Sequence, residues 1–264
     1  MRETIYQTLT KQFNQERLRA ILSSGQAVVM HRLAIMSKDG DWILRDDEEC
    51  LNHVLSVLES HGARYRFGAP LDLRWLSNGW SSHFEFLSGN MRVRTDFVTC
   101  PPRITPTELR GLWERAEASN DEVPFVDVPT LIELKKTNRE KDYVVIGELA
   151  RRIEDPARQL LAARSARDIM DLVRRYPDLA AAAERQRPLL VRARDGSAPL
   201  EVALDAERRE LIHANEQRLQ SYIDASHAWR YAWPEIGAET EEMSLRDAHR
   251  HIVRRAERVL PQLV

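Results

Sequence analysis

The spacing of hydrophobic residues divides the chain into a first part of mixed helices and strands and a second part that is helical. Apolar residues at four-residue steps from Ile5 to Phe13 predict a first helix. A longer helix is predicted to end at Gly62, and Asp46 and Glu49 have the spacing of a capping box at its start. The apolar stretch 26–35, bounded by turn residues, predicts a short buried helix.

Alternating segments between these helices predict the strands of a mixed sheet. Turn residues separate the predicted strands, which are 17–25, 39–45, 63–67, 71–76, 82–87 and 91–100. Pro101 and Pro102 end the last one, because proline cannot donate a sheet hydrogen bond. A helix capped by Thr105 follows, and 130–153 predicts one broken helix or two helices that meet near Asn138.

Beyond Asp155 the strand pattern disappears and apolar residues keep helical spacing to the end of the chain. The segment 194–199 is the one strong turn cluster within this part. We therefore predict an α+β fold: a mixed-sheet domain with flanking helices over 1–154, and an all-helical domain over 155–264.

Composition narrows the possible partners and compartments. Hydrophobic residues make up 43% and charged residues 30% of 264, which is ordinary for a globular protein. The net charge of −2 provides no global field, so an anionic ligand must be met by a local group of charges. Cys50 and Cys100 have no CxxC spacing and do not form a disulfide framework in so long a chain, which favours a reducing, cytoplasmic setting. We expect neither a signal peptide nor a membrane span.

Two aspartates lie one residue apart in the predicted strand 39–45. Residues two apart in a strand point to the same face, so Asp39 and Asp41 project side by side and repel each other unless a cation lies between them. Mg²⁺ prefers such carboxylate oxygens together with substrate phosphates. The alternative is a solvated edge strand, or a turn around Gly40.

A third carboxylate, Asp96, lies in an otherwise apolar strand. Burying an unpaired aspartate costs several kcal/mol, so this residue needs a cation as a partner. The partner is either an arginine, with Arg92 and Arg94 as the neighbours in sequence, or a metal. Three carboxylates that meet in one sheet would suit two-metal phosphoryl transfer.

Four separate elements, taken in order, resemble the minimal nucleotidyltransferase family, which shares the catalytic core of polymerase-β-like enzymes. They are Ser24-Gly25-Gln26-Ala27-Val28, Ser37-Lys38-Asp39-Gly40-Asp41, the isolated strand residue Asp96, and the segment 131–149 with its Lys…Arg-x-Lys-Asp pattern. The resemblance covers residues 17 to 153 and stops where the helical part begins.

The resemblance implies roles for particular residues. Asp39 and Asp41 would bind two Mg²⁺ ions, and Asp96 would hold the ion that activates the attacking hydroxyl. The implied nucleotide-binding residues are Ser24, Gly25, Lys38, Lys135, Arg139, Lys141 and Asp142. The first two would offer backbone N–H groups to a triphosphate at a helix start. For the cationic residues of 135–141, the alternative is the solvated face of a helix.

The implied reaction is Mg²⁺-dependent transfer of a nucleoside monophosphate from a nucleoside triphosphate to an acceptor hydroxyl, with release of pyrophosphate. The acceptor could be a small molecule, a tRNA or a protein. Ser24 and Arg32 replace glycines of the family pattern, Gly40 replaces an apolar residue, and Ile35 replaces an arginine. These departures raise an alternative: an inactive member that serves as a binding or regulatory partner, for example in a toxin–antitoxin or phage-defence pair.

Two aromatic segments have two interpretations each. Trp75, Trp80, His83 and Phe84 either pack the sheet or form a wall beside the active cleft. The segment 226–235, which contains three aromatic residues, either closes the helical part over the catalytic part or meets a partner protein. His249 and His251 are two apart on a helix, so they point in different directions and are not expected to be metal ligands.

Overall fold

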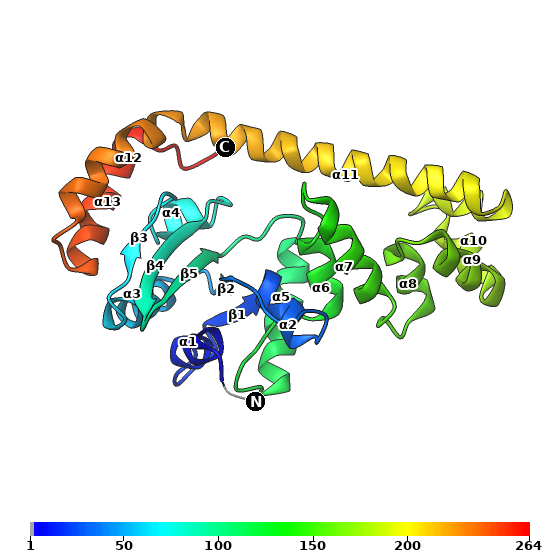
Figure 1. Cartoon of the computed structure of the whole chain (residues 1–264), viewed down its shortest axis with the longest axis horizontal. Coiled ribbons are helices and arrows are strands. Elements are labelled where there is room, and N and C mark those ends of the chain that lie inside the picture. Colours follow the sequence, from blue (N-terminus) through cyan, green and yellow to red (C-terminus); the bar gives the residue numbers. More distant parts are fainter. Residues whose placement is uncertain (1–2) are drawn as a thin grey trace. The chain divides into compact units, whose positions relative to one another are not determined.

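The computed structural model describes residues 3–264 and is built around a five-stranded mixed sheet (Figure 1). The strand order is β1-β2-β5-β4-β3, with β2 and β5 parallel and the other neighbours antiparallel. The strands are β1 Ala20–Ser23, β2 Asp39–Leu44, β3 Arg64–Tyr65, β4 Ser82–Ser88 and β5 Met91–Val98.

Helices flank the strands, and beyond Asp155 the chain consists of helices joined by turns. This arrangement confirms the predicted α+β class with a helical C-terminal region. In the first part they are α1 Ile5–Phe13, α2 Ser24–Met30, α3 Glu48–Ser60, α4 Leu73–Leu76, α5 Pro106–Ser119, α6 Val128–Leu134 and α7 Glu140–Ala150. In the second part they are α8 Pro156–Ala162, α9 Ala166–Arg175, α10 Pro177–Ala183, the 3₁₀ helix η1 Pro188–Arg194, α11 Ser197–Ala225, α12 His227–Thr240 and α13 Leu245–Val259.

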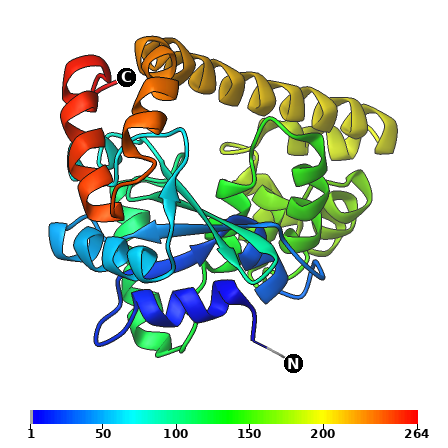
Figure 2. The same cartoon turned by 60° about the vertical axis from the view of Figure 1, so that its left-hand side comes forward.

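One face of the sheet is buried beneath α1 and α3 (Figure 2). Its centre is aromatic: Trp42 of β2 stacks on Phe97 of β5 with ring centroids 5.4 Å apart, and Phe13 of α1 meets both rings edge-on. Burial of such side chains removes the largest apolar areas from water. The alternation of β5, with Val93, Thr95 and Phe97 inward, follows the predicted pattern.

The chain divides into two compact units, which are described separately below. The first contains residues 1–126 and 220–264, and the second contains residues 127–219. The second unit has its own apolar core, which includes Leu160, Ile169 and Leu200. This division differs from the predicted boundary at Asp155, because the last helices pack with the first unit while α6 and α7 group with the second.

The last helices cover the β3–β4 side of the first unit. Trp229 of α12 is buried and donates its ring N–H to the Gly68 carbonyl at 2.9 Å, and Trp75 donates to the Leu260 carbonyl at 3.1 Å. Tyr231 is 88% exposed. The first aromatic residue of the segment 226–235 therefore packs within this unit, and Tyr231 points to solvent.

Two local predictions about elements 46–62 and 71–76 were wrong. The predicted strand 71–76 is the short helix α4, because Asp72 caps it by accepting from the Arg74 N–H at 3.0 Å and its apolar residues turn inward together. Helix α3 is capped by Asp47 rather than Asp46, since the Asp47 carboxylate accepts from the Cys50 N–H at 2.7 Å.

Other local predictions are confirmed. Thr105 and Glu108 form a capping box at the start of α5. Helices α6 and α7 meet around Asn138, and the turn cluster 194–199 separates η1 from α11. One prediction in this region differs from the structure: strand β1 is buried on both of its faces, whereas its alternation predicted burial of one face. Over residues 3–264, no helix has the length and apolar character needed to cross a bilayer.

Gly40 permits the aromatic packing under β2, and its replacement should be costly. A Cβ at this position would lie 2.4 Å from the Trp42 ring and 2.6 Å from the Tyr6 ring. We expect Gly40→Val to lower the free energy of unfolding by about 1–3 kcal/mol, measured by urea denaturation. The control is Gly237→Ala within α12, where an added Cβ would meet no atom within 4 Å. We expect this variant to raise the free energy of unfolding by about 0.5–1 kcal/mol, because alanine favours a helix more than glycine does. Equal effects at both positions would contradict this packing argument.

Candidate functional site

A row of polar side chains crosses four strands on the face of the sheet opposite the aromatic core. The register pairs His83 of β4 with Asp96 of β5, Asp96 with Asp41 of β2, and Asp41 with Ser23 of β1. Paired residues on neighbouring strands project to the same face and lie about 5 Å apart. Parallel pairing of β2 with β5 therefore brings two predicted site carboxylates side by side.

The adjoining row alternates in charge and contains the third predicted carboxylate. Asp39 pairs with Arg94, and Arg94 pairs with Glu85. The Oδ1 atom of Asp39 is buried and has no hydrogen-bond partner. Between the two rows, Gly40 and Thr95 are buried and face the core. The predicted common face of Asp39 and Asp41 is confirmed, and the register adds Asp96 to that face.

Asp96 is held by two groups that the sequence did not indicate. His83 Nδ1 lies 2.6 Å from Asp96 Oδ1, and a guanidinium nitrogen of Arg66 lies 3.4 Å from the same oxygen. The other ring nitrogen of His83 lies 2.8 Å from Ser81 Oγ. The alternative of an ion pair with Arg92 or Arg94 was wrong, although both lie on the same face of β5 as Asp96: Arg94 is paired in register with Asp39 and Glu85, whereas β4 presents His83 directly opposite Asp96.

The loop before β2 is pinned by side chains from α1 and α2. Tyr6 donates its hydroxyl to the Lys38 carbonyl, and the Gln26 amide donates to the carbonyls of Ser37 and Asp39 at 3.1 and 3.2 Å. Burial, and after it the negative charge of Asp39, raise the pKa of Tyr6, so its hydroxyl stays protonated as a donor. These contacts place Asp39 at the start of the strand.

Two positions where the resemblance leads us to expect glycine keep a backbone conformation that favours glycine, although neither residue is one. Ser24 has φ +47° and Arg32 has φ +56°, both in the left-handed region that glycine enters most easily. Gly25 allows a close approach, because a Cβ there would lie 2.3 Å from Ser37 Oγ. The turn that leads into α2 therefore keeps its left-handed conformation, although Ser24 adopts it with more strain than glycine would.

Two of the predicted cations, Lys135 and Arg139, bind the buried carboxylate of Asp142 in the second unit. Asp142, at the start of α7, accepts from Lys135 Nζ at 3.3 Å, from Arg139 Nε at 2.8 Å and from the Thr137 hydroxyl. Burial alone would raise the pKa of Asp142, but the Thr137 hydrogen bond and the two cations outweigh it and lower the pKa. Lys135 is buried, whereas Arg139 and Lys141 are exposed.

The predicted site residues therefore fall into two groups. Ser24, Gly25, Lys38 and the three carboxylates belong to the first unit, where register and loop contacts gather them. The group Lys135, Arg139, Lys141 and Asp142 belongs to the second unit. Tyr6 and Arg66 were missed, and Gln26 and His83 were named in the sequence without these roles, because each reaches the site through a contact between separate segments.

The donor chemistry of the carboxylates suits a hard divalent cation. The partnerless buried oxygen of Asp39 is the kind of atom that a cation would satisfy, and Asp41 lies on the same face. Asp96 is engaged by His83 and Arg66, and within residues 3–264 no three His, Cys, Asp or Glu side chains are grouped so that they could hold a metal. Asp39 and Asp41 are thus the residues that fit, and Asp96 would join them through Oδ2, because both of its contacts are made to Oδ1.

Comparison with known proteins yields only distant structural likeness. No protein-family model and no curated protein matches the chain. A solved structure of a candidate nucleotidyltransferase from H. pylori aligns with a TM-score of 0.41 at 12% identity, covering 78% of this chain and 94% of that one. The protein JHP933 from Helicobacter pylori aligns with a TM-score of 0.38 at 13% identity, covering 81% and 93%. Scores this low support no transfer of function.

Ser24→Gly should relieve the strain at the start of α2. Because Ser24 has φ +47°, we expect the glycine to raise the free energy of unfolding by about 0.5–1 kcal/mol, measured by urea denaturation. Its neighbour Ser23 has φ −131°, an extended conformation open to any residue, so Ser23→Gly should lower stability instead. A loss of stability in Ser24→Gly would contradict the strain argument.

Asp142→Asn should destabilise the second unit by leaving Lys135 buried without a counter-ion. We expect a loss of about 3 kcal/mol in the free energy of unfolding at neutral pH. The lowered pKa of Asp142 stabilises the fold above the unfolded pKa of about 4, and this stability is lost as the pH falls through the folded pKa. The variant should therefore lose less stability on acidification, as denaturation at pH 7 and pH 3 would measure.

The matched control is the exposed pair of Asp205 and Arg208, one turn apart on α11 in the same unit. Asp205→Asn should leave stability nearly unchanged, because exposed ion pairs contribute little. If both variants lost the same stability, the network around Asp142 would have no special structural importance.

Proposed function

We propose that the protein is a nucleotidyltransferase that moves a nucleoside monophosphate from a nucleoside triphosphate to an acceptor hydroxyl and releases pyrophosphate. The observation that carries the proposal is the register of β2 on β5, which sets Asp41 opposite Asp96, with Asp39 and its partnerless oxygen on the same face. Acidic groups at such short spacing repel each other, and a cation bound between them relieves the repulsion.

Asp39 and Asp41 would hold magnesium, and two ions are expected. When bound, Mg²⁺ would neutralise charge on the transferring phosphate and favour loss of the proton from the attacking hydroxyl. The chain supports this arrangement by fixing the start of β2: Tyr6 and Gln26 hold the backbone of Lys38 and Asp39, so the two carboxylates need little ordering when a ligand arrives.

Asp96 would receive the proton of the acceptor hydroxyl. Both of its contacts, from His83 and from Arg66, are made to Oδ1, so Oδ2 is the oxygen that would face the reacting group. His83 and Arg66 act here as positioning residues, because they orient the carboxylate without needing to touch the substrate.

The phosphate tail of the nucleotide would be met by backbone and cationic groups. Ser24 and Gly25 begin α2 directly after Ser23, which pairs with Asp41, so their N–H groups would bind phosphate oxygens near the carboxylates, with Lys38 beside them. In the second unit, taken by itself, the exposed cations Arg139 and Lys141 would bind phosphate, and Asp142 would orient Arg139.

The acceptor is a small molecule, a tRNA or a protein, and the site would act in the cytoplasm. The alternative is a catalytically inactive protein of the same fold that serves as a binding or regulatory partner, for example in a toxin–antitoxin or phage-defence pair, and that does not bind nucleotide. Metal-dependent nucleotide binding separates the two: thermal shift with each triphosphate, with and without Mg²⁺, should raise the melting temperature only when both are present.

Asp96→Asn should abolish transfer while the fold stays intact. We expect the rate of label transfer from radiolabelled triphosphates, incubated with cell extract, to fall by about 100-fold or more, because the amide cannot accept the proton. Asp39→Asn and Asp41→Asn should also remove the Mg²⁺-dependent thermal shift. The control is Asp121→Asn in an exposed loop, which should keep full activity. Unchanged transfer by Asp96→Asn with a native melting temperature would refute this mechanism.

A further inference from the structure

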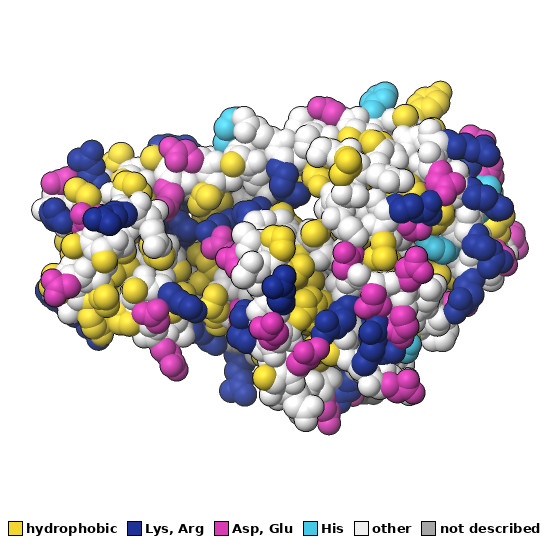
Figure 3. Space-filling view, turned by 180° about the vertical axis from the view of Figure 1, so that it is seen from behind, with side chains coloured by type: hydrophobic (Ala, Val, Ile, Leu, Met, Phe, Trp, Pro, Cys, Tyr) yellow, Lys and Arg dark blue, Asp and Glu magenta, His cyan; other side chains and the backbone are white. Residues whose placement is uncertain are grey.

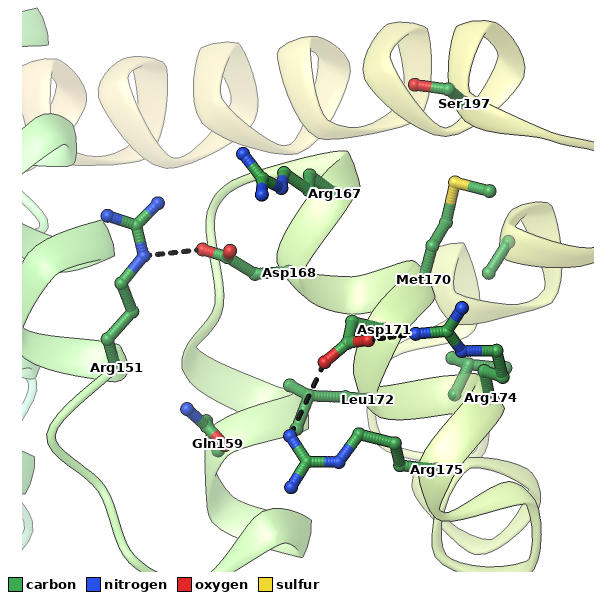
Figure 4. Close-up of a pocket in the computed structure, with 12 residues that line it drawn as sticks. Arg151, Gln159, Arg167, Asp168, Met170, Asp171, Leu172, Arg174, Arg175 and Ser197 are labelled. Atoms are coloured by element: carbon green, nitrogen blue, oxygen red, sulfur yellow. Dashed lines mark hydrogen bonds and ion pairs between the residues drawn. The ribbon is translucent and has the colours of Figure 1, made fainter.

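The second unit contains an open hollow of about 1120 Å³ that none of the roles above uses. It lies among the end of α7, the helices α8 and α9, η1 and the start of α11 (Figure 4). Four of the side chains that line it are arginines, namely Arg151, Arg167, Arg174 and Arg175, and two are aspartates, Asp168 and Asp171. The lining therefore carries an excess of positive charge.

The aspartates hold three of these arginines in place without neutralising the hollow. Arg151 donates to Asp168 at 2.9 Å, and Arg174 and Arg175 both bind Asp171 (Figure 4). In the part of the chain that the structure describes, Arg167 has no ion pair, and its guanidinium extends beside the hollow. Arginines that are already oriented by carboxylates lose less side-chain freedom when they bind an anion.

The positive charge is local to this stretch of sequence. Residues 151–197 contain eleven arginines, no lysine and seven acidic residues, although the whole chain carries a net charge of −2. Elsewhere, basic and acidic side chains are interspersed over the surface, as on the face in Figure 3. Arginine presents a planar fork that binds the oxygens of phosphates and carboxylates in pairs, so a group of arginines favours an oxyanion over a simple halide, and several arginines together suit a ligand that carries several such groups.

We propose that this hollow binds the phosphodiester backbone of a nucleic-acid strand. The hollow is open and larger than most small-molecule pockets, and its guanidinium groups stand on opposite sides, so that successive phosphates of one strand can each meet an arginine. A bilayer is a flat surface and would not enter a concave site. RNA and DNA share this backbone chemistry, and the experiment distinguishes them.

This inference rests on the second unit alone and does not require the proposed transfer reaction. The assay is fluorescence anisotropy of labelled 20-nucleotide single-stranded RNA and DNA with the full chain, over a series of salt concentrations. The test variant is Arg167→Ala/Arg174→Ala, because one residue has no ion pair and the other is 79% exposed. The matched control is Arg250→Ala/Arg254→Ala on α13, which removes the same charge from two exposed positions. Arg250, like Arg174, forms an ion pair with an aspartate one turn away, here Asp247.

We expect the test variant to bind either strand or both about 10-fold more weakly at low salt, while the control stays within about 2-fold of the unaltered protein. The slope of log affinity against log salt should shrink by about 1.4, since two phosphate contacts are lost at about 0.7 each. A greater loss for one strand than for the other identifies which of the two nucleic acids the hollow accepts.

Three outcomes would overturn the inference: absence of binding to both strands, equal losses in test and control variants, or arginine-dependent binding of polyglutamate or anionic vesicles without binding of nucleic acid. Arg167→Glu provides a second variant that breaks no ion pair, so a folding defect in the double variant would not hide the answer. If Arg167→Glu has a native circular dichroism spectrum and binds both strands as tightly as the unaltered protein, the inference is also overturned.

Discussion

The parallel pairing of β2 with β5 is the constraint on which the candidate site depends. It places Asp41 opposite Asp96, and because side chains alternate along a strand it also sets Asp39 on the same face and the aromatic rings on the other. A shift of one residue would turn the carboxylates into the core and Trp42 into solvent. The hydrophobic effect that buries Trp42 and Phe97 thus also enforces the spacing of the acidic groups.

The same coupling explains why unusual residues are tolerated around the site. Gly40 lies where Tyr6 and Trp42 leave no room for a Cβ, so the space that a side chain would take is filled by rings from elsewhere. Ser24 and Arg32 hold left-handed backbone that glycine would enter at lower cost. In each case the local preference of a residue yields to packing or to the path of the chain, which is typical of functional sites.

Each unit contains a carboxylate that is held by partners from other parts of the chain. Asp96 in the first unit and Asp142 in the second are both held by cations and hydrogen-bond donors that arrive from other elements or turns. A half-buried carboxylate needs such partners, so each is costly to leave alone and each orients the groups around it. The arginine hollow differs, because its cations outnumber the carboxylates that hold them.

The sequence by itself determined the helices, most strands and the common face of Asp39 and Asp41, because periodicity, capping residues and strand alternation act over a few residues. The prediction failed at 71–76, where alternating apolar residues suggested a strand but Asp72 caps a short helix. It also failed for the partner of Asp96, because Arg92 and Arg94 were the only arginines near it in the sequence. Tertiary structure alone decided that His83 and Arg66 hold Asp96, that Gln26 and Tyr6 pin the strand, and that residues 220–264 return to the first unit. Those choices depend on register and packing between segments far apart in the chain, which no local pattern encodes.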